Sequence, residues 1–432
     1  MTTRTVKYAY MAEPTASQRR WLAGAFGAVR VVYNCYVWDR EQAFESQSGA
    51  KPRKLYLAKG LPQDMGWLAQ YSTIFRQQAV RQAEVAYKNF FAGLSGQRAN
   101  RVGKPLFKKR RSGSSLTWNG RSLKVRQLSR RWAAVRLPKE GSWLRFRLSR
   151  KLPNSPTGVT LKLSPAGEYT VSFTVREEIA EPKASGSAAG VDMGLIDLAS
   201  VVQDDGSRYK IPAPKSYRRA ERKLARLQRE HSRKVRGSQN REKARLALAK
   251  QHGRVARQRL DQARKLAAKL TSENQVVSLE ALNLKGLTRT KLSKSFADAG
   301  LGQLAACVEQ AAAKRGTRFE RVDPAFTSQA CAVCGAIDGP KPLAVREWRC
   351  PCGAELDRDY NAALNILLLA GGHSESLNGP GGRISREALA SPESAAMLAE
   401  GATSYAVHQP RRRRTRAKSL ARRAQLKAHA FA

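Results

Sequence analysis

The sequence predicts a mixed α/β protein with an added β-barrel and helical parts. Three observations carry this prediction. Residues 115–176 alternate between apolar and polar positions in short segments, which is typical of an antiparallel sheet or a small barrel. Residues 188–322 instead follow the order of three strands, a basic helical region, a strand, a helix and a further strand. Four of the six cysteines gather between residues 331 and 352, which indicates an inserted metal-binding knuckle.

The charge of the chain points to a polyanionic partner. The 432 residues carry a formal net charge of +45, which bound anions have to offset. Nucleic acid is the first candidate and an anionic membrane surface is the second. Because the basic residues are spread over nearly the whole chain, we favour nucleic acid and expect no membrane association. The chain contains no run of apolar residues long enough for a transmembrane helix, and its N-terminus lacks the apolar core of a signal peptide.

The N-terminal part, residues 1–180, is expected to be a β-barrel domain interrupted by a helical insert. Residues 2–10 alternate enough for a first strand that joins the later sheet. One helix starts after Pro14, and a second helical region runs from residue 65 to residue 94, so the insert spans about residues 15–98. Apolar side chains recur at helical spacing in both regions, and we interpret them as core: Leu22, Phe26, Val29, Val32, Tyr36, Val80, Ala83, Tyr87, Phe90 and Leu94.

A basic stretch and a predicted hairpin follow the helical insert. Residues 103–111, GKPLFKKRR, combine cations with one aromatic residue. This composition favours a loop that contacts a nucleic-acid backbone, and a solvated charge run is the alternative. Residues 159–163 and 169–175 alternate in polarity around a turn at 164–167, which predicts a hairpin. Residues 181–187 are a linker by composition.

The second domain, residues 187–370, is predicted to begin with a three-stranded meander. Its strands cover residues 188–193, 197–203 and 208–211. Asp192 lies inside the apolar first strand. A carboxylate in a buried strand is costly unless it has a partner, and a metal ion is one such partner.

Residues 215–270 predict two basic helices that fold back on each other around a break at Gly237. Sparse leucines supply one packed face, and the opposite face carries Lys and Arg. A nucleic-acid surface explains the density of arginine better than simple solvation does. A strand at 274–280, a helix at 297–315 and a strand at 318–322 follow.

The last 62 residues differ from the rest in composition. Residues 371–432 are rich in Gly, Ser, Glu and Ala and then in Arg. We expect a basic, disordered tail that adds nonspecific affinity.

Three acidic positions are the candidate catalytic groups. They are Asp192, Glu280 at the end of its strand, and the pair Asp357 and Asp359 before a helix at 361–369. The predicted element order is that of an RNase H-like fold, in which these positions meet at one edge of the sheet. Carboxylates gathered in one cleft need cations, and two Mg²⁺ ions would support phosphodiester hydrolysis. The residues alone leave open whether Asp357 or Asp359 completes the set.

The cysteines predict one structural Zn²⁺ ion. Cys331, Cys334, Cys350 and Cys352 have the spacing C-x2-C-x15-C-x1-C, and four thiolates suit tetrahedral zinc. Cys35 and Cys307 have helical surroundings and are interpreted as buried free thiols, so cysteine usage fits a reducing compartment.

Other chemistries find little support. The five histidines are scattered away from the cysteines and the acids, which argues against a histidine-metal nuclease and a Ser/His/Asp hydrolase. No G-x-x-x-x-G-K-[ST] loop is present, so we expect no use of ATP.

Four segments in a fixed order resemble a known family. GVDMGLIDLA, VVSLEALNLKGL, TSQACAVCG and CGAELDRDYNAALNI are similar to motifs of the TnpB (OrfB) family of insertion-sequence proteins, which is related to the type V CRISPR nucleases. The resemblance covers roughly residues 5–370.

The resemblance implies an RNA-guided DNA endonuclease of a transposable element. It implies a RuvC-type nuclease domain, a wedge-like N-terminal domain with a recognition insert, and a short target-adjacent motif read by the N-terminal half. The partners would be a guide RNA from the transposon end and double-stranded target DNA, bound by a monomer in a prokaryotic, nucleoid-associated, cytoplasmic setting. The matching residues are Asp192, Glu280 and Asp359 for Mg²⁺, and the four cysteines for Zn²⁺.

The chain departs from the family pattern at one point, and two alternatives stay open. The second cysteine pair is usually C-x2-C, whereas Cys350 and Cys352 enclose one residue. This puts zinc affinity and the placement of Asp359 in question. A transposase that cuts and joins DNA is one alternative, although the sequence has no clear helix-turn-helix. A DNA-binding repressor that has lost cleavage is the other.

Overall fold

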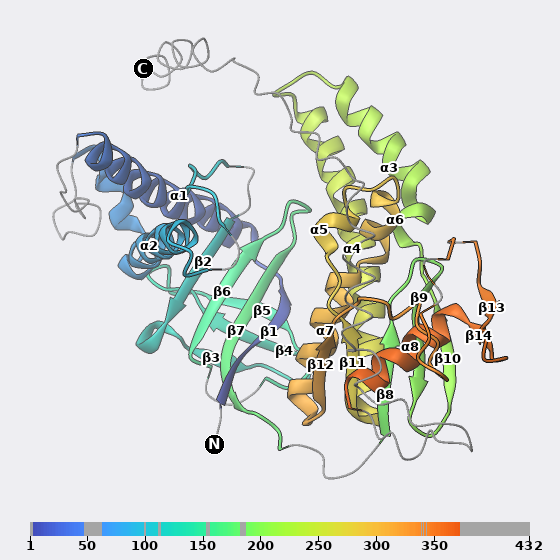
Figure 1. Ribbon diagram of the computed structural model, residues 1–432. Helices are drawn as coiled ribbons and strands as arrows, with labels where there is room; N and C mark the ends of the chain where they lie inside the picture. The colour runs from blue at the N-terminus through green and yellow to red at the C-terminus, as the bar shows by residue number, and fades with distance from the viewer. Residues whose placement is uncertain are drawn as a thin grey trace.

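The computed structural model contains two large β-sheets, each with helices packed on it, and a small two-stranded sheet (Figure 1). It describes residues 3–46, 63–98, 101–110, 114–152, 156–181, 187–337, 339, 341–342 and 344–371. Residues 372–432 of the predicted tail lie outside the described part.

The first sheet has seven strands in the order β2-β6-β7-β1-β5-β4-β3. Its strands are β1 (Thr3–Ala12), β2 (Ser114–Asn119), β3 (Val125–Gln127), β4 (Trp132–Arg136), β5 (Trp143–Arg147), β6 (Gly158–Leu163) and β7 (Tyr169–Glu178). β1 pairs antiparallel with β7 from Thr3↔Glu178 to Ala12↔Tyr169, so the predicted joining of the first strand to the later sheet is confirmed. The strands form a linear order and not a closed ring in the described residues, so this part is a sheet where we expected a barrel.

The helical insert packs on this sheet through aromatic and aliphatic side chains. It consists of α1 (Ala16–Glu45), the 3₁₀ helix η2 (Gln63–Gln70) and α2 (Thr73–Leu94). Thr15 caps α1 in a capping box with Gln18, which explains why the helix starts directly after the proline. The ring of Phe75 in α2 meets that of Trp118 in β2 at 5.8 Å, and both side chains are buried. Leu94, expected in the core, is 58% exposed at the end of α2.

The second sheet has five strands in the order β10-β9-β8-β11-β12. The strands are β8 (Ser187–Asp192), β9 (Asp197–Gln203), β10 (Arg208–Pro212), β11 (Asn274–Glu280) and β12 (Arg318–Val322). β8, β9 and β10 form the predicted antiparallel meander, while β8, β11 and β12 are parallel to one another.

Helices cover both faces of the second sheet. The basic hairpin is formed by α3 (Ser216–Arg233) and α4 (Gln239–Glu273), as predicted. α4 and α7 (Leu301–Arg315) share a buried core with one face of the sheet, whereas α8 (Arg358–Leu369) crosses the sheet at β8 and β9 (Figure 1). The remaining elements are α5 (Leu284–Leu287), α6 (Ser293–Ala299), β13 (Glu347–Arg349) and β14 (Glu355–Asp357).

One predicted helix is divided in two. We expected a single helix over residues 297–315, but α6 ends at Ala299 and α7 begins at Leu301. Gly300 lies between them with φ of 68°, a left-handed conformation that glycine adopts readily and that ends a helix.

Candidate active and metal-binding site

Asp192 and Glu280 are the last residues of two parallel, neighbouring strands, β8 and β11. The register pairs Val191 with Leu279, so the two acids lie one position further along at the same edge of the sheet. Side chains alternate between the two faces of a strand. Val191 and Leu279 belong to the core under α4 and α7, which places Asp192 and Glu280 on the opposite face.

Gly190 allows α8 to lie directly on that opposite face. A Cβ atom on Gly190 would come within 2.1 Å of the Ala363 carbonyl oxygen and 2.7 Å of the Leu367 nitrogen. Both are backbone atoms of α8, so only glycine permits this approach. The close packing brings the start of α8, and with it Asp359, to the edge where Asp192 lies.

The charges of Glu280 and Asp359 act on the Asp192 carboxylate. Desolvation, followed by the charges of Glu280 and Asp359, raises the pKa of Asp192 from its ordinary 3.8 to about 7, and Arg358 opposes the shift only in part. Burial also raises the pKa of Glu280, while a hydrogen bond from the Thr327 hydroxyl opposes that shift. Acids gathered in this way favour a bound cation, because a cation relieves their mutual repulsion.

Asp357 is the N-cap residue of α8, whereas Asp359 lies in the first turn of the helix. Its carboxylate accepts hydrogen bonds from the backbone nitrogens of Asp359 (3.0 Å) and Tyr360 (2.9 Å), so it caps the N-terminus of α8. Lys210 of β10 donates to both of its oxygens at 2.9 and 2.7 Å. Burial alone would raise the pKa of Asp357, but Lys210 and the backbone donors outweigh it and lower the pKa. The Asp357 carboxylate therefore already has hydrogen-bond partners within the protein.

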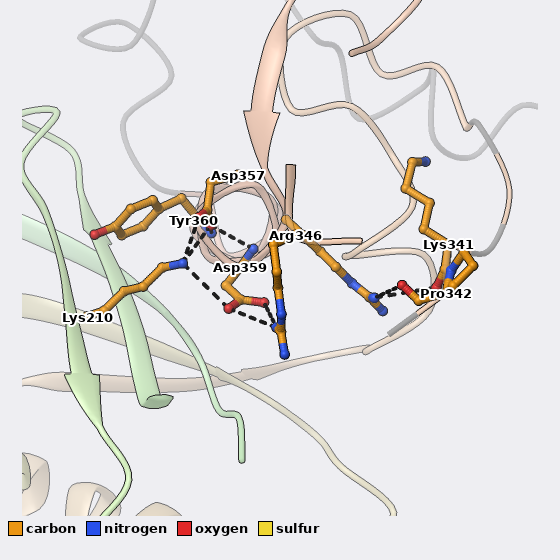
Figure 2. A network of polar contacts seen from close by, with 8 residues as sticks. Lys210, Lys341, Pro342, Arg346, Asp357, Asp359 and Tyr360 are labelled. Carbon is orange, nitrogen blue, oxygen red and sulfur yellow. Dashed lines mark hydrogen bonds and ion pairs between the residues drawn. The ribbon is translucent and has the colours of Figure 1, made fainter. Parts of the chain in front are cut away.

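Asp359 lies between two cations (Figure 2). Arg346 Nη1 is 3.2 Å from Asp359 Oδ1 and 3.3 Å from Oδ2. Lys210 Nζ lies 3.6 Å from Asp359 Oδ2, which is further than from Asp357. The Asp359 side chain is 17% exposed and that of Asp357 is 26% exposed, so exposure does not distinguish the two acids; their hydrogen-bond partners do.

The four cysteine sulfurs converge on one point. Their Sγ atoms all lie within 4.8 Å of one another, with Cys331 and Cys352 at 3.9 Å and Cys334 and Cys350 at 3.6 Å. A tetrahedral ion with Zn–S bonds of about 2.3 Å needs neighbouring sulfurs roughly 3.8 Å apart. The cluster therefore fits one tetrahedral metal ion.

The shortened second cysteine pair is accommodated by a tighter turn. In the first turn the Gly335 nitrogen donates to the Cys331 carbonyl oxygen, four residues earlier. In the second, the Gly353 nitrogen donates to the Cys350 carbonyl oxygen, three residues earlier. Both glycines have positive φ, 77° and 88°, which such turns require. The missing residue therefore changes the turn without separating the sulfurs.

Two asparagines of α8 hold the cysteine segment against the helix. Asn361 Oδ1 accepts from the Ala332 nitrogen at 2.9 Å, and Asn361 Nδ2 donates to the Ala330 carbonyl oxygen at 2.7 Å. Asn365 Nδ2 donates to the Thr327 and Ala330 carbonyl oxygens, each at 2.8 Å. These bonds are buried, so the cluster and the helix that carries Asp359 form one unit.

Sequence reasoning missed three side chains that touch the acids: Lys210, Thr327 and Arg346. Thr327 belongs to the TSQACAVCG motif, but nothing in that motif shows that its hydroxyl reaches Glu280. Lys210 and Arg346 are single cations in a chain with 79 basic residues, so composition gave no reason to choose them. Only the strand register brings them to the site.

Three family models match parts of the chain. A model described as "Probable transposase", OrfB of IS605, matches residues 170–291. A Cas12f1-like TNB domain model matches residues 302–366, which include all four cysteines. A helix-turn-helix domain model of the same OrfB group matches residues 1–49.

This last match concerns one expectation from the sequence. We expected no recognisable helix-turn-helix, yet a model of that name covers the N-terminus. Over residues 3–46 the structure has one strand, β1, followed by one continuous helix, α1. The described residues of this segment thus form no pair of short helices around a turn, which agrees with the expectation, although a model of that name matches the sequence.

Whole-chain relatives and solved structures agree with these matches. A "Putative RNA-guided DNA endonuclease" of Streptomyces pristinaespiralis is 35% identical over 89% of this chain and 93% of its own length. A "Putative RNA-guided DNA endonuclease InsQ" of Escherichia coli K12 is 30% identical over 71% of this chain and 76% of its own. A solved Cas12f1–sgRNA–target DNA complex resembles the fold with a TM-score of 0.54 at 12% identity, over 84% of this chain and 98% of that chain.

The fold of a mini-RNA-guided endonuclease, CRISPR-Cas phi3, is also similar, with a TM-score of 0.51 at 10% identity over 85% of this chain and 92% of that chain.

Within the described residues, no helix has the length and apolar character that crossing a membrane requires.

Proposed function

The chain belongs to the TnpB (OrfB) family of insertion-sequence proteins, and on this premise we propose that it is an RNA-guided DNA endonuclease of a transposable element. The observation that carries the proposal is the meeting of Asp192, Glu280 and Asp359 on one face of the five-stranded sheet. A desolvated carboxylate whose pKa is raised by two neighbouring acids, as that of Asp192 is, is typical of a site built to hold cations.

We propose that the nuclease part is an RNase H-like, RuvC-type domain over residues 187–370. Its sheet order, β10-β9-β8-β11-β12, with an antiparallel meander and two added parallel strands, supports this assignment. Asp192, Glu280 and Asp359 would hold two Mg²⁺ ions, which supply an activated water and charge stabilisation for phosphodiester hydrolysis. The chain itself orients the acids: Thr327 holds Glu280, and the cap formed by Asp357 and Lys210 fixes the turn that carries Asp359.

The four cysteines would hold one structural Zn²⁺ ion. The sulfur spacing suits it, and the donor set of four thiolates is the one zinc prefers in structural sites. Because Asn361 and Asn365 bind the cysteine segment to α8, the ion would stabilise the element that carries Asp359.

The proposed partners are a guide RNA from the transposon end and a target DNA duplex, bound by a monomer in the prokaryotic cytoplasm. The net charge of +45 supports polyanion binding through counterion release. A groove of about 840 Å³ lies between β1 and helices α4 and α7. Its lining includes Glu309, several alanines and six basic residues: Arg4, Lys7, Arg150, Arg264, Lys314 and Arg315. We assign residues 1–180 to a wedge-like part that reads a short target-adjacent motif, with base pairing supplying the remaining specificity.

A transposase that joins DNA ends is the second candidate, because the matching family models are described as a probable transposase and a helix-turn-helix domain. The two candidates differ in their products and in their need for RNA. An endonuclease leaves free ends and loses target choice when its RNA is digested, whereas a transposase joins ends without RNA.

The test begins with the full chain purified together with its RNA. The copurified RNA is sequenced, and a plasmid library that carries the matching target beside randomised flanks is exposed to the complex with Mg²⁺. We expect cleavage at the matched target, loss of cleavage after RNase treatment, and no detectable cleavage by Asp192→Ala with RNA and DNA binding retained. Cleavage by Asp192→Ala at the wild-type rate would contradict the proposal.

A further inference from the structure

The first sheet carries an arginine-rich face on the strands β3, β4 and β5. On these strands Val135, Leu144 and Phe146 belong to the core that the sheet shares with the helical insert. Because side chains alternate along a strand, the neighbouring residues point to the opposite face. The strand register places six of those side chains next to one another, and we call them the Trp–Arg face: Arg126, Trp132, Arg136, Trp143, Arg145 and Arg147.

Planar groups lie over this face of the sheet. The Arg126 guanidinium carbon is 4.2 Å from the centre of the Trp143 ring. The Arg145 guanidinium carbon is 4.6 Å from the centre of the Trp132 ring, so both pairs make cation–π contacts. Ala134 lies between Arg126 and Arg145 in the register and is fully buried, although it faces away from the core. The pairs therefore cover the sheet, and the guanidinium groups of the exposed arginines form its outer surface.

The positive charge of the Trp–Arg face is not compensated by the described part of the chain. None of its four arginines forms an ion pair with a described carboxylate. Like charges held close together on one face cost free energy unless an anion binds over them. The stability of the sheet alone therefore does not explain why four arginines gather here, and the face suits an anionic partner.

An unpaired nucleic-acid strand matches this chemistry better than a duplex does. Aromatic rings and guanidinium planes bind bases by stacking, and this needs the flat face of the base. A duplex presents the edges of its bases in the grooves, whereas unpaired nucleotides expose their faces. A guanidinium group can stack on a base and still donate hydrogen bonds to a phosphate.

We propose that the Trp–Arg face binds an unpaired stretch of the guide RNA, whose bases stack on the arginine and tryptophan planes and whose phosphates pair with the arginines. The inference rests on the proposed function, because that function supplies the RNA. A folded RNA carries unpaired loops and ends, and it is bound before any target. Target DNA is unpaired only in its displaced strand. That strand has to reach the acids on the second sheet, whereas the Trp–Arg face belongs to the first.

The first test measures RNA affinity with the full chain and the guide RNA identified by sequencing, over a series of KCl concentrations. Trp132→Ala and Trp143→Ala should each raise the dissociation constant by about tenfold, the usual effect of losing one stacked base. The slope of log affinity against log salt should stay unchanged, because no charge is removed. Trp132→Phe should recover most of the affinity. Trp67→Ala removes a 40% exposed tryptophan on η2 and is the matched control, with no change expected.

The arginines of the face should respond differently from the tryptophans. Arg126→Ala and Arg145→Ala should each weaken RNA binding and also reduce the salt slope by about 0.7, the value for one phosphate contact to a single strand. Arg126→Lys should restore the slope but only part of the affinity, because lysine keeps the charge without the planar group. Slopes that are equal in all variants would mean that no phosphate is bound here, which would overturn the inference.

The second test locates the contact by crosslinking. The complex of the full chain and its guide RNA, without DNA, is irradiated with ultraviolet light and digested, and peptides that carry RNA are identified by mass spectrometry. Peptides from residues 125–147 should carry RNA nucleotides. Links to RNA at other peptides but not at these would overturn the inference. Links from these peptides to DNA alone, after target is added, would mean that the displaced strand is the occupant and would overturn it too.

A purely structural role of the Trp–Arg face gives another pattern. Trp132→Ala and Trp143→Ala would then lower the melting temperature and leave the RNA dissociation constant at the wild-type value, which would overturn the inference. The proposed function fails instead if RNase leaves cleavage unchanged or if Asp192→Ala cuts at the wild-type rate, and the inference then fails with it. The variants of the Trp–Arg face alone overturn only the inference.

Discussion

The two faces of the five-stranded sheet differ sharply, although the same strands supply both. The face under α4 and α7 carries Val191, Val277 and Leu279, all fully buried in an apolar core. The face under α8 carries Gly190, Asp192, Ser278 and Glu280 at the alternating positions. One face stabilises the fold, while the other carries desolvated charge, which suits the cation site that we propose there. A change on one face should therefore affect stability and cleavage very differently from a change on the other.

Gly190→Ala should have the largest effect, because it moves α8. The added Cβ would lie 2.1 Å from the Ala363 carbonyl oxygen, so the helix that carries Asp359 has to shift. We expect no detectable cleavage and a lower melting temperature. Gly158→Ala is the matched control in β6, where the nearest atoms to an added Cβ lie at 3.6 Å, an ordinary contact. Cleavage by Gly190→Ala at the wild-type rate would show that Asp359 does not depend on this close packing.

Cys350→Ser should remove bound zinc and lower cleavage by about 100-fold, the upper range for loss of a group that orients metal ligands. Cys350 is buried in the cluster that Asn361 and Asn365 connect to α8. Zinc per chain is measured by elemental analysis beside the cleavage rate. Cys307→Ser is the control, because Cys307 lies in α7 outside the cluster. If a variant without zinc still cleaves DNA at the wild-type rate, the cysteine cluster does not influence the active site.

Lys210→Met should lower cleavage by about tenfold, since it removes a positioning contact and no catalytic group. Asp357 would keep its backbone donors but lose the Lys210 ammonium group, so the first turn of α8 would be held less firmly. The Mg²⁺ concentration for half-maximal rate should rise, and Lys210→Arg should restore much of the loss. An unchanged Mg²⁺ dependence in Lys210→Met would argue that Asp357 needs no partner.

Leu279→Ala should have the smallest effect on cleavage and a clear effect on stability. The side chain is 1% exposed in the apolar core, and its truncation should cost about 2–5 kcal/mol of unfolding free energy. Below the melting transition the cleavage rate should stay near the wild-type value. Ser278→Ala, one residue away on the opposite face, removes a buried hydroxyl that has no hydrogen-bond partner among the described residues and should change stability little. Denaturant unfolding measures the free energy of unfolding of both variants. Equal losses in the two variants would contradict the proposed difference between the two faces of the sheet.

The sequence allowed much of this arrangement to be predicted because the relevant signals are local. An aspartate in an apolar strand, a glutamate closing a later strand and closely spaced cysteine pairs are all visible in a single stretch of chain. The choice between Asp357 and Asp359 was not visible from the residues, because it depends on the cap of α8 and on Lys210, which is distant in sequence. The resemblance to the family points to Asp359, and this choice stays a prediction; the structure adds that Asp357 caps α8 and pairs with Lys210.

Other features depend on three-dimensional register and could not be predicted from local patterns. In the sequence, Gly190 does not differ from an ordinary strand residue. Its importance comes from the close contact with the backbone of α8. The break at Gly300 was missed because an isolated glycine inside a helical pattern is often tolerated. Arg346 reaches Asp359 only because β13 pairs with β14, and neither short strand has a recognisable pattern of its own.

The most direct test of the account measures melting temperatures of the wild type and Asp192→Asn, with and without Mg²⁺. A pKa of about 7 in the folded state, against 3.8 ordinarily, means that the fold favours the protonated acid. Its contribution to stability is complete below about pH 4 and is lost as the pH rises toward and through 7. At pH 8 without Mg²⁺ we therefore expect Asp192→Asn to melt higher than the wild type, with the difference shrinking at pH 5. Mg²⁺ should raise the melting temperature of the wild type but not of the variant; equal responses to Mg²⁺ would contradict a cation site formed by these three acids.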